Sequence, residues 1–419
     1  MAITRQIVSK SINATATTYV GKDGEVWADP INNTLRIGDG TTAGGILLTG
    51  GGGGGATTWA ALGDKNNANG PTTIALGELA GNTGQSTNAV AIGKLAGETS
   101  QGAQGAVAIG YTAGQTGQEQ GAIAIGIAGT TNQGEFATAI GWGAGTATQG
   151  EGALAIGVNT GQTSQGTYAS AFGAEAGFTS QGNYAIASGY RAGKTSQGKN
   201  TVAIGRTAGE ISQGVNAVAI GVFAGRTNQG GSSVAVGESA GHTNQGQNSI
   251  AIGWESAQTG QGTTATAVGN SAGKTNQGEN ATAIGAGAGV TNQGAAAVAI
   301  GAGAGVTTQS ANAVALGFEA GMTTQGLNSV AIGTGAGLTT QGTNAVAIGP
   351  RAGEISQVQY AIAIGDYAGK SAQSGAAVAI GRNSGKVSQG NKAIAIGESS
   401  GGTNQGIDGI AIGFNSAGF

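Results

Sequence analysis

The residue types that most often perform catalysis are few in this chain and do not group in the sequence. His242 is the only histidine, and cysteine is absent, so neither a thiolate metal site nor a disulfide can form. Acidic residues stand singly, as at Glu151, Glu210 and Glu354, and give neither paired catalytic carboxylates nor a calcium-binding repeat. Glycine-rich strings such as residues 285–289 lack the following helix of a phosphate-binding loop. The sequence therefore predicts no enzyme, no metal site and no cofactor.

Aromatic side chains offer a chemistry of recognition instead. Several occupy one variable position, directly after the tripeptide A-I-G or its variants: Tyr111, Trp142, Tyr190, Trp254 and Phe318. An aromatic face can stack on a sugar ring or pack laterally against a neighbouring chain. The sequence leaves both interpretations open for these five residues.

The elements that carry these residues form a repeat of about sixteen residues, A-V-A-I-G-x-x-A-G-x-T-x-Q-G-x-N. It runs from about Thr72 to the C-terminus in about 22 copies, with one extra residue before Gly110 and one missing before Gly141. Self-similarity at so short a period is typical of a solenoid, in which each copy is one coil that must stack on its neighbours. At about 4.8 Å per coil, 22 coils give a rod on the order of 100 Å long.

The pattern within one copy predicts strands. A helix is excluded because each copy holds several glycines and no apolar period of 3.6 residues. The run A-V-A-I alternates small and large residues, which is the period of a strand. Two short strands joined by two glycine turns make one coil, so we predict an all-β parallel β-solenoid, or flattened β-roll.

The alternation assigns two faces to the first strand. We predict that Val and Ile fill the coil interior, as at Val90, Ile92, Val218, Ile220, Val346 and Ile348. The small residues would then form a flat outer stripe too long for a monomer to expose. We therefore predict a chain–chain interface at Ala89, Ala91, Ala217, Ala219, Ala345 and Ala347.

Two polar positions distinguish the second strand. No copy replaces the glutamine, which we interpret as a structural ladder of stacked amides, as at Gln101, Gln165, Gln229, Gln293 and Gln341. The threonine two residues earlier gives way to Ile211, Ile355 and Val387, which favours packing inside the coil. A binding role for the amides and an ice-binding role for the threonines are the alternatives.

Composition and charge exclude several partners. The 419 residues include 87 glycines, only 9% are charged, and the net charge is −3 without a basic block, which predicts no nucleic-acid binding. No apolar run approaches the roughly 18 residues that span a bilayer, and the first residues have no apolar signal core. We expect no membrane insertion and no encoded secretory signal.

Four regions follow along the chain. For residues 1–48 the sequence predicts a small β-meander, and for residues 49–55 it predicts a flexible glycine hinge. Residues 56–71 contain a degenerate copy that we predict to cap the stack. Residues 72–419 form the solenoid shaft.

Two resemblances extend this interpretation. The strings S-V-A-I-G at residues 329–333 and N-A-V-A-I-G at residues 344–349 resemble the head repeats of trimeric autotransporter adhesins, which implies a left-handed, homotrimeric β-roll that binds host surfaces. Residues 24–45, G-E-V-W-A-D-P-I-N-N-T-L-R-I-G-D-G-T-T-A-G-G, resemble a small β-module near the start of tailed-phage virion proteins, especially fibres. This second resemblance implies attachment to other virion proteins through residues 1–48.

Together these features lead us to expect a phage fibre or similar virion appendage, extracellular after release, that holds a repetitive rod against a host surface. Its partners would be two further copies of the chain, other virion proteins, and either host-surface glycans or a separate tip protein. The alternatives are a cell-surface adhesin exported and anchored by other proteins, and an ice-binding or scaffolding rod.

Overall fold

The computed structural model describes residues 73–417 apart from Ala103, and in the N-terminal region residues 19, 20, 22, 26–29, 34–37, 40–43 and 46–47. The chain divides into two compact units, Met1–Lys65 and Asn66–Phe419. The predicted hinge at residues 49–55 and capping copy at residues 56–71 lie outside the described residues.

The first unit contains a small antiparallel sheet. Its strands are β1 (Val26–Asp29), β2 (Thr34–Ile37) and β3 (Ile46–Leu47), and they pair in the order β1-β2-β3. These strands form the meander that the sequence predicts within residues 1–48.

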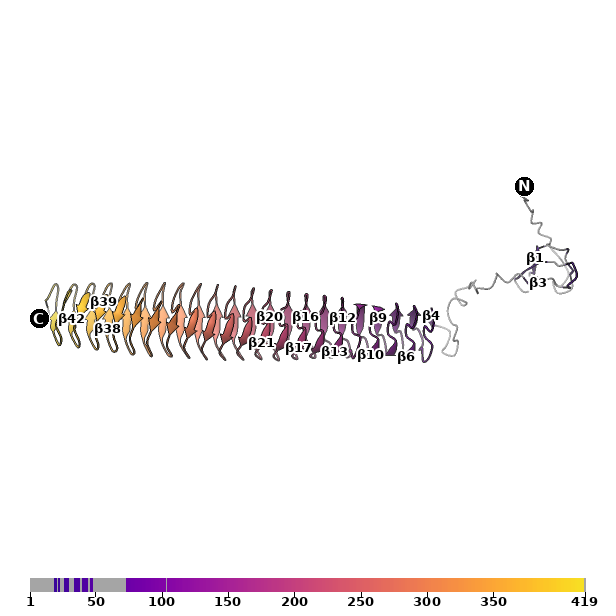
Figure 1. Cartoon of the computed structure of the whole chain (residues 1–419), viewed down its shortest axis with the longest axis horizontal. Coiled ribbons are helices and arrows are strands. Elements are labelled where there is room, and N and C mark those ends of the chain that lie inside the picture. The colour runs from indigo at the N-terminus through magenta and orange to yellow at the C-terminus, as the bar shows by residue number, and fades with distance from the viewer. Residues whose placement is uncertain are drawn as a thin grey trace, which may run out of the picture. The chain divides into compact units, whose positions relative to one another are not determined.

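The second unit is a stack of coils in which every regular coil contributes one strand to each of two parallel sheets (Figure 1). We call the first sheet the valine sheet, and its strands are β4 (Ile74–Leu76), β5 (Val90–Ile92), β7 (Val107–Ile109), β9 (Ile123–Ile127), β11 (Thr138–Trp142), β12 (Leu154–Ile156), β14 (Ser170–Phe172), β16 (Ile186–Ser188), β18 (Val202–Ile204), β20 (Val218–Ile220), β22 (Val234–Val236), β24 (Ile250–Ile252), β26 (Thr266–Val268), β28 (Thr282–Ile284), β30 (Val298–Ile300), β32 (Val314–Leu316), β34 (Val330–Ile332), β36 (Val346–Ile348), β38 (Ile362–Ile364), β40 (Val378–Ile380), β42 (Ile394–Ile396) and β43 (Ile410–Ile412).

The second sheet, which we call the glutamine sheet, consists of β6 (Thr99–Gln101), β8 (Thr116–Gln118), β10 (Thr131–Gln133), β13 (Thr163–Gln165), β15 (Thr179–Gln181), β17 (Thr195–Gln197), β19 (Ile211–Gln213), β21 (Thr227–Gln229), β23 (Thr243–Gln245), β25 (Thr259–Gln261), β27 (Thr275–Gln277), β29 (Thr291–Gln293), β31 (Thr308–Gln309), β33 (Thr324–Gln325), β35 (Thr340–Gln341), β37 (Ile355–Gln357), β39 (Ser371–Gln373) and β41 (Val387–Gln389). It is interrupted between β10 and β13, where only isolated bridges join Gln133 to Gln149 and Gln149 to Gln165.

Each strand pairs in register with its equivalent in the next coil. In the valine sheet Val218, Ala219 and Ile220 face Val234, Ala235 and Val236, and the pairing runs from β4 to β43, each of which has a single neighbour. The 22 strands of this sheet therefore enclose about 21 coils. The described residues contain no helix, and the predicted parallel β-solenoid is confirmed.

Glycine at the end of A-I-G allows neighbouring coils to approach closely. Gly221 has φ +130°, and a Cβ added there would lie 2.6 Å from the carbonyl oxygen of Gly237 in the next coil. A side chain is excluded both by the backbone conformation and by the contact. This position therefore fixes the spacing at one turn of every coil.

The interior of the coil is the reverse of the prediction. Ala89, Ala91, Ala217, Ala219, Ala345 and Ala347 are all fully buried and pack inside the coil, so they cannot form the predicted chain–chain interface. Val90, Ile92, Val218, Ile220, Val346 and Ile348 are half-buried or exposed and point outward. Alanines of the two halves of each coil form its apolar core, and the larger buried side chains beside them are glutamines.

The predicted glutamine ladder is present. Gln101, Gln165, Gln229, Gln293 and Gln341 are buried, each at most 3% exposed. The Nε2 of Gln341 donates to the carbonyl of Val330 across the coil at 2.7 Å and to Oε1 of Gln357 in the next coil at 3.1 Å. Each glutamine thus joins the two sheets of its coil, and most also join successive coils.

The glycine of A-G-x-T-x-Q leaves the space that this amide occupies. Gly225 has φ +51°, and a Cβ there would lie 2.6 Å from Oε1 of Gln229. The threonine position, by contrast, is half-buried or exposed, and its replacements Ile211, Ile355 and Val387 are exposed at 41%, 43% and 37%. The prediction that threonine packs inside the coil is wrong, because β-branched residues are favoured here by strand conformation and not by burial.

Candidate functional site

The outer side of the valine sheet is an apolar face. It is formed by the first and third residues of the V-A-I segment in 22 strands, 44 positions in all. Of these, 39 are Val, Ile, Leu or Phe, and the other five are Thr138, Ser170, Ser188, Thr266 and Thr282. None is charged. With a length of roughly 100 Å and a width of about 10 Å, the face covers on the order of 1,000 Å², more than monomers usually expose.

The outer side of the glutamine sheet is a polar face. It carries the threonine file and, beside it, a file of Ser, Asn, Gly and Thr residues with one alanine, Ala372. Amides in the second file bond along the rod, as from Nδ2 of Asn228 to Oδ1 of Asn244 at 3.0 Å. The face is regular, with small side chains at the spacing of adjacent strands.

The five aromatic residues predicted as a recognition site are exposed but not grouped. Tyr111, Trp142, Tyr190, Trp254 and Phe318 are 45–67% exposed, in agreement with a surface position. Two to four coils separate each from the next, which is about 10–20 Å along the rod. The structure therefore presents them as single aromatic side chains and not as one cluster.

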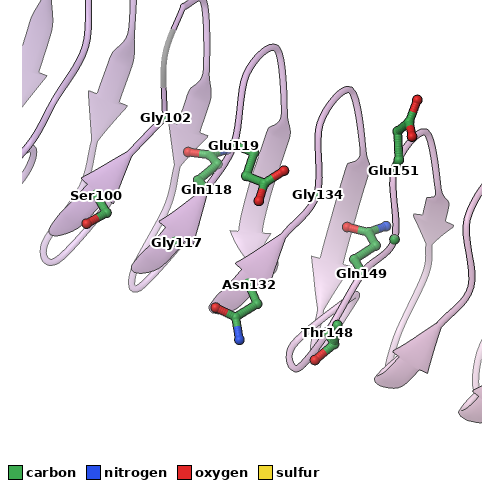
Figure 2. Close-up of a pocket in the computed structure, with 11 residues that line it drawn as sticks. Ser100, Gly102, Gly117, Gln118, Glu119, Asn132, Gly134, Thr148, Gln149 and Glu151 are labelled. Carbon is green, nitrogen blue, oxygen red and sulfur yellow. The ribbon is translucent and has the colours of Figure 1, made fainter.

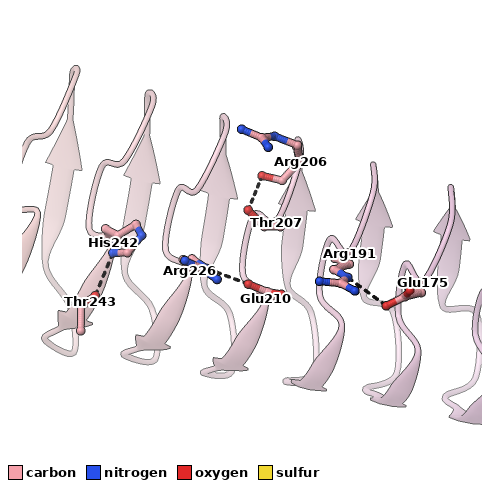
Figure 3. Close-up of polar contacts among 8 residues, drawn as sticks. All are labelled: Glu175, Arg191, Arg206, Thr207, Glu210, Arg226, His242 and Thr243. Carbon is pink, nitrogen blue, oxygen red and sulfur yellow. Dashed lines mark hydrogen bonds and ion pairs between the residues drawn. The ribbon is translucent and has the colours of Figure 1, made fainter.

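Charged residues at the same edge link neighbouring coils (Figure 3). The carboxylate of Glu175 lies 2.9 Å from Arg191 Nε and 2.7 Å from Lys194 Nζ. The hydrogen bond from Lys194, assisted by Arg191, holds the pKa of Glu175 below its ordinary value. Glu210 pairs with Arg226 at 2.7 Å. These ion pairs are partly exposed and therefore add little stability.

His242 lies in this charged edge. Its Nδ1 is 2.8 Å from Oγ1 of Thr243, and its ring meets Phe223 edge-on at 6.1 Å. Burial lowers the pKa of His242, and the nearby Arg226 cation lowers it further. In the described residues no group of three His, Asp or Glu side chains is arranged to hold a metal ion.

The surface is hollowed where the repeat changes length (Figure 2). The hollow has a volume of about 580 Å³ and crosses four successive coils of the polar face. Its residues are Ser100, Gly102, Gly117, Gln118, Glu119, Asn132, Gly134, Thr148, Gln149, Gly150 and Glu151. We call it the acidic groove, because Glu119 and Glu151 are its only ionisable lining residues.

A row of aromatic residues borders the acidic groove, and the sequence analysis did not single it out. Phe136, Tyr168 and Tyr184 occupy the turn before the valine sheet and are 56%, 48% and 52% exposed. The rings of Tyr168 and Tyr184 stack with centroids 5.7 Å apart. The Tyr168 hydroxyl donates to Oε1 of Glu151 at 2.5 Å, and this bond is the main reason that the pKa of Tyr168 is raised.

A signal for the groove was present in the sequence. The coil before Gly110 is one residue longer than sixteen and the coil before Gly141 is one shorter. Glu119 also follows Gln118 where most copies have glycine. These departures coincide with the hollow, whereas the aromatic row is visible only when positions sixteen residues apart are placed side by side.

No protein-family model matches the chain, and no curated protein matches it in sequence. No membrane-spanning helix occurs among the described residues. Function is therefore inferred from the chain's own surfaces.

Proposed function

We propose that the chain is a non-enzymatic fibre of a phage virion, in which a homotrimeric, left-handed rod reaches from the particle to the host surface. Residues 1–48 would attach it to other virion proteins, as the resemblance of residues 24–45 implies. Three identical chains can engage weak surface ligands together and so gain avidity. Bound to the particle, and extracellular after release, such a rod acts by reach and multivalency.

The observation that carries this proposal is the apolar face. On the order of 1,000 Å² of uncharged, flat surface exceeds the roughly 800 Å² per partner of a standard interface. Val and Ile files on a parallel sheet can pack against equivalent files of another chain. The chains would therefore associate through the valine sheet, with the polar faces and turns left outside.

The test is the mass of the rod in solution. We expect light scattering to give three times the chain mass of 39.8 kDa. A triple variant of the apolar face, Val218→Lys, Val234→Lys and Ile250→Lys, should dissociate the trimer because buried unpaired cations are costly. The matched variant of the polar face, Thr227→Lys, Thr243→Lys and Thr259→Lys, should remain trimeric.

Two results would reject the proposal. A monomeric wild-type chain would exclude the trimer, and absence of the protein from purified particles by immuno-electron microscopy would exclude the virion. Location on a cell surface would instead favour the adhesin alternative.

A second candidate function is ice binding, and the outward threonine file favours it. Threonine methyl and hydroxyl groups repeat on a flat face at the strand spacing of about 4.8 Å, beside small polar residues such as Asn228 and Asn244. Measurable thermal hysteresis of the purified rod, lost in the triple polar-face lysine variant, would support this candidate. Freezing behaviour equal to that of buffer would eliminate it.

A further inference from the structure

The acidic groove is the place where the solenoid departs from its own repeat. The two coils of irregular length are the first and third of the four coils that line it, and the glutamine sheet breaks beside it between β10 and β13. A local departure from an otherwise consistent pattern often marks a functional site. The departure here produces a hollow and not merely a bulge.

The lining of the groove is rich in hydrogen-bonding groups. Ser100, Asn132 and Thr148 lie along one side, and Glu119 and Glu151 along the other (Figure 2). Gly117 takes the place that Ser100 and Asn132 occupy in the adjacent coils, and the missing side chain deepens the hollow. Carboxylates, an amide and hydroxyls together can accept from and donate to a polyhydroxylated ligand.

The amide ladder is also open beneath the groove. Gln149 lines the hollow and is 1% exposed. Its Oε1 has no hydrogen-bond partner, and in Figure 2 this oxygen points toward the coil of Gly134. The Oε1 atoms of Gln101, Gln197, Gln229 and Gln261 also lack a partner in the described chain, and of these five glutamines only Gln149 lines the groove.

The aromatic row supplies a flat border. A Cβ at Gly121 would lie 2.8 Å from the ring of Phe136, and one at Gly152 would lie 2.5 Å from the ring of Tyr168. Glycine in these coils therefore lets each ring lie along the edge of the rod. Phe136, Tyr168 and Tyr184 also adopt φ +54° to +59°, a conformation that costs bulky residues energy.

The surrounding charge excludes an anionic ligand. Between Lys94 and Arg191 the sequence contains five glutamates and no Lys, Arg or His. The resulting potential repels acidic sugars, phosphates and nucleic acid. Hydroxyl and ammonium groups, by contrast, donate hydrogen bonds to carboxylates.

We propose that the acidic groove and its aromatic row bind a saccharide that carries no acidic group. Its hydroxyl or amino groups would bond Glu119, Glu151 and Asn132, and one of its ring faces would lie on Phe136 or Tyr168. This inference deepens the proposed host contact and rests on it for a biological role, although saccharide binding itself requires neither a virion nor a trimer.

The experiment measures binding of the full chain to labelled hexasaccharides by fluorescence anisotropy. The probes are maltohexaose, mannohexaose, cellohexaose and chitohexaose, with a chitosan hexamer as the amine-bearing arm and hexagalacturonate as the acidic arm. The test variants are Phe136→Ala and the double variant Glu151→Gln, Tyr168→Ala. The control is Glu279→Gln, Tyr360→Ala, because these residues hold the equivalent turn positions far from the groove.

We expect at least one neutral or amine-bearing probe to bind and hexagalacturonate not to bind. The double variant at the groove should raise the Kd about tenfold, as the loss of one aromatic contact and one charged acceptor implies. The control variant should change it less than about twofold. Amide exchange in the coils around each substituted residue shows whether that variant remains folded.

Binding of no probe, preferential binding of hexagalacturonate, or equal weakening by the control variant would overturn the inference. Light scattering on the same samples separates this outcome from the proposed function. A trimer that binds none of the saccharides would reject the saccharide site but not the proposed fibre. A monomer that binds a saccharide would reject the trimeric fibre but not the site.

Discussion

At the scale of the residue, glutamine is the side chain on which each coil depends. It is long enough to cross the interior from the glutamine sheet and polar enough to satisfy a carbonyl of the valine sheet. From Gln261 to Gln389 every amide also donates to the glutamine of the next coil, at 3.1–3.2 Å. A hydrophobic residue of similar length would fill the volume but leave these polar groups without partners.

Replacing one amide within this unbroken run tests its contribution. Gln341→Leu would remove the donor to Val330 and leave the amides of Gln325 and Gln357 each short of one partner. Unsatisfied buried groups cost about 1–3 kcal/mol each, so we expect a loss of roughly 2–5 kcal/mol. Because coils contribute almost independently, amide hydrogen exchange should accelerate mainly in the coils around residue 341.

The matched control is Gln359→Leu, which lies in the next coil, two residues after Gln357, on the exposed surface. It introduces the same side chain without opening the ladder, so exchange rates should stay close to those of the wild type. Equal effects of the two substitutions would show that the ladder does not stabilise the coil.

His242 predicts how stability depends on pH. Burial and Arg226 lower its pKa from 6.5, with Glu210 opposing them weakly. Above pH 6.5 the imidazole is neutral in both states; as the pH falls through 6.5 the unfolded chain gains the proton first, so stability falls until the folded pKa is passed. From about pH 8 to about pH 5 the melting temperature of wild type should therefore fall more than that of His242→Gln. Parallel pH profiles would contradict this assignment.

At the scale of the element, the coil is thin because its strands turn alanine inward. With Ala219 and Ala224 both fully buried, the two halves of the coil approach closely, and the glutamine amide fits between them. The larger Val and Ile residues are then left to the outer side, where strand propensity favours them.

Enlarging an inner and an outer residue of the same strand distinguishes the two sides. Ala219→Leu should destabilise its coil by about 1–3 kcal/mol or more, since a packed interior cannot accept the added volume. Val218→Leu adds a smaller volume on the outer side and should change local stability by less than about 0.5 kcal/mol in the dissociated chain. Local amide exchange measures both losses of stability. A larger loss for Val218→Leu than for Ala219→Leu would indicate that valine, not alanine, faces the interior.

The period, the strands, the parallel stacking and the glutamine ladder could be predicted from the sequence, because each is encoded by residues that recur in the copies. It was not sufficient for the inside and outside of the V-A-I strand. Alternation identifies two faces but not which is buried, and we assigned the larger residues to the core as in ordinary domains. Alanine occupies the buried face because the two sheets approach closely, as the contact between Gly225 and Gln229 shows. The acidic groove was missed because it arises from differences between copies.

At the scale of the whole molecule, the rod is quasi-one-dimensional. In the valine sheet each coil pairs with its neighbours through equivalent residues, and the apolar face continues through every strand of this sheet. Length is therefore a property that evolution can change by whole coils without altering the core or the interface.

Deletions in and out of phase with the repeat test this view. Removing residues 278–341, four coils of sixteen residues, joins Gln277 to Gly342. The remaining coils keep their two strands and their order within the repeat. We expect a folded rod shorter by about 19 Å, with the oligomeric state of the wild type. Removing residues 286–341 instead omits the second strand of one coil, because Gly285 then precedes Gly342. That rod should lose amide protection at the junction, where the glutamine ladder is broken. Electron microscopy gives the lengths and hydrogen exchange the protection; equal stability of the two deletions would mean that the sixteen-residue coil is not the unit of the fold.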